Sequence, residues 1–370
     1  MLVPALRPQT NRFLRALDAG LPEDLVAWQR VWEGAPRREV MAHPAYAQLF
    51  ARPCDRVVAL HGDFGNGSIL LPLLLRPLAA EPWAAPGEDR WDAITPYGYG
   101  GPFAWDTQPD EDAAFWEATS AWCEEERLVS TFLRLSVFTE QLARMPWPLE
   151  VRIHNVAIPL AGGVDAVWRR YDKVVRKWVR KAECAGLEVA LHSDASGIDG
   201  FMPVYLHTMD RCDAESVFPR SFFEALAHHL AGRYVFAHVL LEGKVVSTEL
   251  TLCSDDAIYS FLGGTLSSAF ALGPNYLLKH RLACWAAERG VRHYVLGGGR
   301  SLRDSLLEYK RHFARHGELP FKVASVVHDA QAYAELAIRR ADVTRQLGGT
   351  WIPQPGFFPA YRAPPAMDGS

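Results

Sequence analysis

The chain has 370 residues, a net charge of −4 and a hydrophobic content of 49%, which together are typical of an ordinary globular protein. This charge excludes a general attraction to nucleic acid, so any site for a polyanion has to be a local patch. The length exceeds the usual size of one hydrophobic core and therefore favours two domains.

Other classes of protein are excluded by the residue pattern. The N-terminus lacks the charged and apolar regions of a secretory signal. The longest apolar run, Ile69 to Leu75, contains Pro72 and is far shorter than the ~20 residues of a membrane helix. The six cysteines are scattered and show no metal-binding spacing. We therefore expect a cytoplasmic protein with reduced thiols, no transmembrane segment and no metal site.

The first half contains a run of strands followed by a helix and one more strand. Residues 56–75 form two apolar runs around Asn66-Gly67, the dipeptide that best fits a hairpin turn with positive φ. The next predicted elements are a strand at 91–101, a helix at about 112–126 and a strand at 130–138.

The second half repeats this order. Its predicted elements are strands at 236–244, 245–253 and 257–265, a helix at 275–288 and a strand at 292–298. A shared order at this long spacing indicates two copies of one domain, although any α/β protein produces similar strings. The C-terminal part is predicted to contain a helix at 303–316, a strand at 321–329 and a helix at 330–348 that packs back on the first domain.

A meander of antiparallel strands followed by a helix and a parallel strand resembles the core of the GNAT acyltransferase fold. In that fold the central strands splay apart, and the next helix begins at the cleft with its unpaired N–H groups facing a donor. Here the helix begins in LGPNY (272–276), where Pro274 and Asn275 suit the first turn and the cap. The CoA-dependent pattern is Arg/Gln-x-x-Gly-x-Gly/Ala, whereas FALGPN has a single glycine, which weakens a CoA site without excluding it.

The strongest local signal is a basic segment at residues 168–189. Its apolar residues fall at helical spacing, and cations fill most of the remaining positions. These cations are Arg169, Arg170, Lys173, Arg176, Lys177, Arg180 and Lys181. A solvated helix face normally carries both signs of charge, so the segment favours binding of RNA or another phosphate-rich ligand. A merely solvated face and a membrane-surface helix are the alternatives.

Several short motifs resemble the Fem family of aminoacyl-tRNA-dependent peptidyltransferases. In the second half they are RKAECAGLEV (180–189), YSFLGGT (259–265), GPNYLLKHRLACWAAERGVRHYVLGGG (273–299) and LLEYKRHF (306–313). In the first half they are HPAYAQLF (43–50) and TPYGYGGP (95–102). The resemblance covers most of residues 25–325, and it is to the compact members that lack a long coiled-coil arm.

This resemblance implies an α+β protein made of two tandem GNAT domains with a ligand cleft between them. We expect residues 1–157, completed by 326–350, to form the first domain, 158–325 to form the second, and 351–370 to form a surface tail. The resemblance also implies amide formation without a cofactor, in which an acceptor amine attacks the ester carbonyl of an aminoacyl-tRNA. Such an ester is already reactive, so positioning supplies much of the rate.

The candidate catalytic residues are Lys310 and Glu249. Lys310 matches the Phe-Lys motif of the family, with Tyr309 in place of Phe, where a cation stabilises the developing oxyanion or holds the tRNA terminus. An exposed helix lysine is the alternative. Glu249 lies on a central strand where many GNAT enzymes keep a base that deprotonates the amine, although strand alternation alone allows its side chain to point to either face.

The candidate substrate-binding residues are Tyr97, Tyr99, Tyr259, Thr265, Asn275 and Tyr309. Tyr97 and Tyr99 are expected to wall an acceptor cleft in the first domain, with a structural loop as the alternative. Tyr259 and Thr265 are expected to orient the acceptor, with strand packing as the alternative. The candidate residues for binding tRNA or phosphate are Lys173, Arg176, Lys177, Arg180 and Lys181.

Three functions remain open. The favoured one is aminoacyl-tRNA-dependent peptide bond formation on a peptidoglycan precursor or a natural-product amine. The second is acyl-CoA-dependent N-acylation of a cell-surface sugar or a small metabolite, and the third is a non-catalytic module that only binds a ligand. The basic segment and the degenerate pyrophosphate loop favour the first, because tRNA brings many phosphates and CoA only a few.

Overall fold

The computed structural model describes residues 13–214, 216–299 and 305–364, and the chain divides into two compact units. The first unit comprises Met1–Pro36, Met41–Glu150 and Lys322–Ser370, and the second comprises Arg37–Val40 and Val151–Phe321. A short N-terminal segment therefore belongs to the second unit although the residues on both sides of it belong to the first. No helix in the described ranges is both long and apolar enough to cross a membrane.

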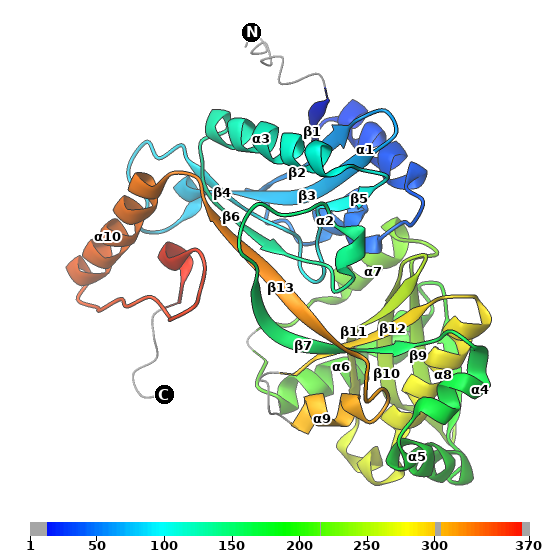
Figure 1. The fold of residues 1–370 in the computed structure, drawn as a ribbon. Coiled ribbons are helices and arrows are strands. Elements are labelled where there is room, and N and C mark those ends of the chain that lie inside the picture. The colour runs from blue at the N-terminus through cyan, green and yellow to red at the C-terminus, as the bar shows by residue number, and fades with distance from the viewer. Residues whose placement is uncertain (1–12, 215, 300–304, 365–370) are drawn as a thin grey trace. The chain divides into compact units, whose positions relative to one another are not determined.

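The first unit is a mixed sheet with helices packed against it (Figure 1). Its strands are β1 (Leu14–Asp18), β2 (Arg56–Asp63), β3 (Ser68–Pro77), β4 (Trp91–Ile94), β5 (Phe103–Trp105), β6 (Leu128–Arg134) and the part of β13 (Glu318–Val327) that starts at Lys322. Its helices are α1 (Pro22–Gly34), α2 (Pro44–Leu49), α3 (Pro109–Glu125) and α10 (Ala330–Gln346). The strand order is β1-β2-β3-β4-β6-β13, with β5 beside β3, and the β4–β6 pair is parallel.

Helix α3 covers one face of this sheet, as its apolar spacing predicts. Phe115 and Trp122 of the helix join Leu71 of β3 in one buried cluster. The helix begins with a capping box, in which the side chains of Gln108 and Glu111 each accept a hydrogen bond from the other's backbone N–H. Local sequence therefore fixes where this helix starts and which face it buries.

The predicted hairpin at 56–75 is present as β2 and β3, but its turn differs from our expectation. We expected positive φ at Asn66-Gly67, whereas the glycine with positive φ is Gly65, at +85°. A Cβ atom on Gly67 would lie 2.8 Å from the carbonyl oxygen of Asp106. Glycine is therefore needed at position 67 because another stretch of backbone passes close to it.

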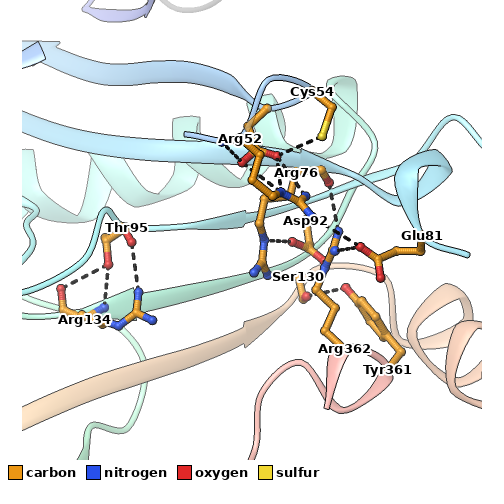
Figure 2. A network of polar contacts seen from close by, with 11 residues as sticks. Arg52, Cys54, Arg76, Glu81, Asp92, Thr95, Ser130, Arg134, Tyr361 and Arg362 are labelled. Carbon is orange, nitrogen blue, oxygen red and sulfur yellow. Dashed lines mark hydrogen bonds and ion pairs between the residues drawn. The ribbon is translucent and has the colours of Figure 1, made fainter. Parts of the chain in front are cut away.

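The opposite face of the same sheet carries the C-terminal segment, residues 351–364. Strand alternation puts Ser130 on this face, and the hydroxyl of Tyr361 lies 2.8 Å from its Oγ atom (Figure 2). Tyr361 and Ala363 are fully buried, and Trp351 is almost so. We expected residues from 351 to run over the surface, but the described part of this segment contributes side chains to the interior of the first unit.

An ion-pair network fastens the C-terminal segment to the sheet (Figure 2). Arg362 forms ion pairs with Asp92 and Glu81, and Nε of Arg76 binds the other oxygen of Asp92 at 2.6 Å. Asp92 is fully buried. A buried carboxylate is tolerated when both oxygens are paired, which is the arrangement here.

The second unit is also a mixed sheet between layers of helices (Figure 1). Its strands are β7 (Glu150–Pro159), β8 (Glu188–His192), β9 (Tyr234–Leu241), β10 (Lys244–Cys253), β11 (Ala257–Thr265) and β12 (His293–Gly298), in the order β7-β12-β11-β10-β9-β8. Its helices are α4 (Gly163–Arg170), α5 (Lys173–Cys184), α6 (Gly197–Arg211), α7 (Arg220–His229), α8 (Pro274–Glu288) and α9 (Ser305–Arg311). The predicted helix at 303–316 is the shorter α9, and residues 303 and 304 lie outside the described residues.

The two faces of the second sheet carry different helices. Helix α8 packs on one face together with α4 and α5, in a core that includes Val179, Leu282 and Ile258. Helix α6 packs on the other face, where a Cβ atom on Gly197 would lie 2.6 Å from Cβ of Phe236. The region that the sequence shows as a central meander is thus covered on both sides.

The two units share one order of elements and exchange their last strands. The order is β2-β3-β4-α3-β6 in the first unit and β9-β10-β11-α8-β12 in the second. β7 follows β6 in the chain but pairs with β12, opposite Gly297, whereas β13 follows α9 but pairs with β6, where Val323 lies opposite Arg134. We call this arrangement the strand exchange. The sheet of the first unit is therefore completed by β13, which follows the second unit's strands in the chain. The sheet of the second unit is completed by β7, which directly follows the first unit's strand β6 in the chain.

Candidate active site

The parallel strands β11 and β12 of the second unit separate part of the way along their length. They pair from Ala257 opposite His293 to Tyr259 opposite Val295, and no further. Beyond that point β11 stays with β10, and β12 stays with β7. The register of β10 and β11 also shifts between Leu250 and Thr251, as at a bulge. We call this divergence the splay.

Helix α8 follows β11 and begins with few backbone donors. Gly273 caps it with a φ of +68°, and Pro274 at its first position has no N–H. The N–H of Gly273 already donates to Phe270, and the N–H of Tyr276 donates to Gly273. Of residues 273–276, Asn275 alone therefore has a backbone N–H that is available to a ligand. The side chain of Asn275 is half-buried.

Glu249 is buried at the splay, and both its carboxylate oxygens are bound. Oε2 accepts from Nζ of Lys279 at 2.7 Å, and Oε1 accepts from the hydroxyl of Tyr294 and from Oγ1 of Thr251, the latter at 3.2 Å. Burial and the charge of Glu249 raise the pKa of Tyr294 well above its usual range. We predicted Glu249 as a base; the structure shows its carboxylate held by an ammonium group and two hydroxyls, and its role as a base stays a prediction.

Lys310 lies on the β12 side of the splay. Its Nζ donates to the carbonyl oxygen of Gly298, the last residue of β12, at 2.6 Å. Neighbouring Tyr309 packs edge-on against Tyr276 at 4.9 Å and against Phe313 at 5.4 Å. The hydroxyl of Tyr309 is buried with no hydrogen-bond partner among the described residues, and burial raises its pKa well above the usual value. The structure thus brings Lys310 to the end of a diverging strand and places Tyr309 inside an aromatic cluster.

Tyr259 and Thr265, predicted to orient an acceptor, make internal contacts instead. The hydroxyl of Tyr259 donates to the carboxyl group of Glu39 at 3.0–3.1 Å, and Oγ1 of Thr265 lies 2.8 Å from Oγ of Ser247. Both side chains are buried. Glu39 belongs to the inserted segment Arg37–Val40, and burial raises the pKa of its carboxyl group to about 7. These contacts match the strand-packing alternative.

The basic segment forms α4 and α5, and most of its predicted phosphate-binding side chains are exposed. Lys173, Lys177, Arg180 and Lys181 are exposed. Arg176 differs, because its Nη1 donates to the carbonyl oxygens of Tyr171 and Trp168 at the end of α4. Arg176 therefore ties the two helices together, while the other four present charge to solvent.

This basic face adjoins the start of α8. Trp178 of α5 stacks on Tyr276 in the first turn of α8, with ring centroids 5.7 Å apart and planes at 10°. A Cβ atom on Gly273 would lie 2.7 Å from the ring of Trp178. Nζ of Lys181 lies 4.6 Å from the same ring centroid, a cation–π contact. The exposed cations and the start of α8 therefore form one continuous region of the second unit.

The predicted tyrosines of the first unit lie on the loop that follows β4. Tyr97 is 54% exposed, and its carbonyl oxygen accepts from the hydroxyl of Tyr46 at 2.7 Å. Tyr99 is half-buried, and burial raises the pKa of its phenol. The same loop is tied to β6, because Nη1 of Arg134 donates to the carbonyl oxygen of Thr95 at 3.1 Å (Figure 2). Tyr97 is thus the one of the two that presents its ring to solvent.

The sequence analysis missed two residues at the splay and one beside it. Lys279 and Tyr294 hold Glu249, and Glu39 holds Tyr259. The signal for Lys279 was available, since this lysine stands among the apolar residues of NYLLKHRLACWAA. A cation at such a position needs a buried partner. No comparable local signal marks Glu39.

Comparison with known proteins gives one family model that matches within the second unit. Residues 169–311 match the model described as Acetyltransferase (GNAT) domain. A comparison with curated proteins gives no match.

Comparison with solved structures gives the fold of most of the chain. The crystal structure of FemX superposes with a TM-score of 0.64 at 13% identity, covering 84% of this chain and 98% of that one. The C-terminal domain of a putative lysylphosphatidylglycerol synthetase from Agrobacterium fabrum has a TM-score of 0.53 at 14% identity, covering 87% and 96%. The structure of L-PGS from Bacillus licheniformis has a TM-score of 0.51 at 13% identity, covering 89% and 97%. The predicted tandem GNAT fold and its resemblance to Fem proteins are confirmed.

Proposed function

Because this chain is a transferase with a GNAT acyltransferase domain and the fold of FemX, we propose that it transfers an aminoacyl group to an amine and so forms an amide bond. The proposed donor is aminoacyl-tRNA. The proposed acceptor is a peptidoglycan precursor or a natural-product amine. A charged tRNA donor would place the reaction in the cytoplasm.

The observation that carries this proposal is the exposed basic face beside the start of α8. Lys173, Lys177, Arg180 and Lys181 are exposed, and Trp178 joins their helix to the first turn of α8. In GNAT enzymes the donor meets this helix start. A row of cations there suits a donor with many phosphates, because each neutralised phosphate releases counterions and adds to affinity.

The start of α8 also favours tRNA over CoA. A bound pyrophosphate is usually wrapped by several backbone N–H groups. Here Pro274 has none, and the N–H groups of Gly273 and Tyr276 are already bonded within the chain. Too few donors remain for a pyrophosphate, whereas the basic face lies outside this loop.

In the proposed reaction the acceptor amine attacks the ester carbonyl carbon and the tRNA ribose oxygen leaves with a proton. Negative charge develops on the carbonyl oxygen as the tetrahedral species forms. Lys310, held by the carbonyl of Gly298 at the end of β12, is the cation we assign to that charge. Tyr97 and Tyr99 on the first unit are the side chains we assign to the acceptor.

A second candidate function uses an acyl-CoA donor and a cell-surface sugar or small metabolite as acceptor. The observation in its favour is the description of the matching domain, which is acetyltransferase. One structural neighbour is instead named as a lysylphosphatidylglycerol synthetase, a name that joins an amino acid to a lipid. That name supports aminoacyl transfer in broad terms.

A donor assay separates the two candidates. Purified protein is incubated with a pool of charged tRNAs or with a panel of acyl-CoAs, each against the same panel of amines, and the products are identified by mass spectrometry. We expect amide products with charged tRNA and none with acyl-CoA. Products with acyl-CoA alone would replace the proposed function with the second candidate.

A further inference from the structure

A buried ion pair sits where β11 and β12 stop pairing. Nζ of Lys279 binds Glu249 at 2.7 Å and also donates to Oγ of Ser260 at 3.2 Å. Ser260 is the first residue of β11 after its last pairing with β12. Tyr294 of β12 donates to the same carboxylate. One ammonium group and one carboxylate therefore connect β10, β11, β12 and α8.

At this point a side-chain hydrogen bond, and not backbone pairing, connects β12 to the strands on its parallel side. Past Tyr259 the two parallel strands share no backbone pairing, and the β10–β11 register shifts beside the same point. The diverging end of β11 is still paired with β10, so only its edge toward β12 lacks a backbone partner. At that edge Tyr294 of β12 binds Glu249, and Lys279 joins Glu249 and Ser260 to α8.

We propose that Lys279 is a positioning residue for acyl transfer, which fixes the first turn of α8 against the diverging end of β11. This inference rests on the proposed function. Lys279 lies one helical turn after Asn275, so the two residues share a face of α8. Holding the ammonium of Lys279 on Glu249 and Ser260 thereby holds the end of the helix that meets the donor.

A purely stabilising role does not account for an ion pair at this place. Lys279 is 8% exposed and Glu249 is 5% exposed, so both charges have lost most of their water. The cost of this desolvation offsets much of the attraction, and apolar residues of similar volume stabilise an interior equally well. What the pair provides and apolar residues do not is a directional link to Ser260 and Tyr294.

The pH profile separates positioning from proton transfer by Glu249. If Glu249 were the base, loss of the neighbouring cation would move the acidic limb of kcat/KM to higher pH. If Glu249 only anchors Lys279, that limb stays where it is in Lys279→Met.

The test compares Lys279→Met, Lys279→Arg and the double variant Lys279→Met/Glu249→Leu with the unmodified protein. We expect Lys279→Met to lower kcat on the order of 10²-fold through misplacement of the donor, and Lys279→Arg to recover part of it. The double variant buries no unpaired charge and should regain stability while kcat stays low. Tyr171→Phe is the control, since the buried hydroxyl of Tyr171 has no hydrogen-bond partner among the described residues.

Hydrogen exchange gives a readout that does not depend on activity. In Lys279→Met the backbone amides of residues 261–265 and 275–278 should exchange faster, and in Tyr171→Phe they should not. Full kcat in the double variant, a shifted acidic limb or unchanged exchange would each overturn the inference. If the unmodified protein turned over no donor, the proposed function would fail, and the exchange data would still decide whether Lys279 holds the splay.

Discussion

Asp92 in the first unit and Glu249 in the second are both buried near a parallel strand pair, and the two carboxylates have different partners. In the first unit the two oxygens of Asp92 go to Arg76 and Arg362. In the second, Glu249 takes one ammonium group, from Lys279, and two hydroxyls. The cation Arg362 lies 270 residues away from Asp92 in the chain, whereas Lys279 lies only 30 residues away from Glu249.

The surroundings of the two carboxylates also differ. In the first unit the arginines seal a sheet face beneath the C-terminal segment, and Tyr361 fills the space beside them. In the second unit the network occupies a point where two strands part, next to Lys310 and the start of α8. In the first unit the buried charges thus hold the C-terminal segment on the sheet, and in the second unit they hold strands and α8 together at the splay.

The largest expected effect comes from removing the ion pairs of Arg362. Arg362→Met leaves Asp92 and Glu81 without a partner that they now share, and loss of one member of a buried pair typically costs about 3–5 kcal/mol. Denaturant unfolding should show this loss, with the C-terminal segment becoming sensitive to protease. Arg345→Met, an exposed arginine of α10, is the control and should change stability by less than about 0.5 kcal/mol. Equal stability of both variants would show that the ion pairs of Arg362 do not stabilise the first unit.

A second effect concerns Glu39, a buried carboxyl group that accepts from Ser254 and Tyr259 and faces the charges of Asp255 and Asp256. Burial raises its pKa in the folded protein to about 7, above the ordinary glutamate value of 4.5. Its contribution to stability is therefore fully present below the unfolded pKa and is lost as the pH rises through about 7, a change of about 3 kcal/mol.

Glu39→Gln should remove this pH dependence of the free energy of unfolding. The measurement is urea unfolding at intervals between pH 5 and pH 8.5, with the exposed Glu188→Gln as the control. A slope that persists in Glu39→Gln would show that a group other than Glu39 titrates in this range.

The third effect tests whether the second unit carries the chemistry. Lys310→Ala should lower kcat about 10²-fold or more, as loss of one oxyanion-stabilising donor does, with Lys310→Arg restoring part. Arg127→Ala removes an exposed cation from the first unit and should leave kcat within a few fold. An equal fall in kcat for both variants would show that the effect is not specific to the second unit. A rise in donor KM alone for Lys310→Ala would mean that Lys310 binds ground and transition states equally.

The smallest effect is on salt dependence. Replacing the exposed Lys173, Lys177 and Lys181 with Ala should weaken tRNA binding and lower the slope of log K against log salt by about one for each phosphate that the protein no longer neutralises. Three exposed arginines of the first unit, Arg30, Arg127 and Arg144, form the control set. An unchanged slope for the lysine variant would remove α5 from the donor site.

Local pattern predicted most elements of the fold but little of the long-range assembly, apart from the return of the C-terminal helix to the first unit. The apolar runs of 56–75 and the meander at 236–265 matched β2, β3 and β9 to β11 closely, because strand alternation is read within a few residues. The strand exchange and the Asp92–Arg362 pair were not predicted, since their partners lie far apart in the chain. No periodicity encodes which partner a strand edge or a buried charge will find.

The candidate site shows the same limit. Motif matching led to Lys310, and the structure puts it at the end of β12, while its assigned role stays a prediction. Glu249 was placed on the correct strand, but only the structure shows that Lys279 holds it. Arg176 was counted with the other cations of α5, yet its contacts with the end of α4 depend on how the chain turns between the two helices.

The strand exchange also affects folding of the nascent chain during synthesis. Strand β6 emerges from the ribosome with the rest of the first sheet, but β13, which covers its edge, follows about 190 residues later. At roughly 5–20 residues per second, that edge stays open for on the order of 10–40 seconds. An open strand edge is a template for wrong pairing, and β7, synthesised directly after β6, is the nearest strand that could take the place of β13. The order of synthesis therefore sets native and mistaken pairings in competition before the chain is complete.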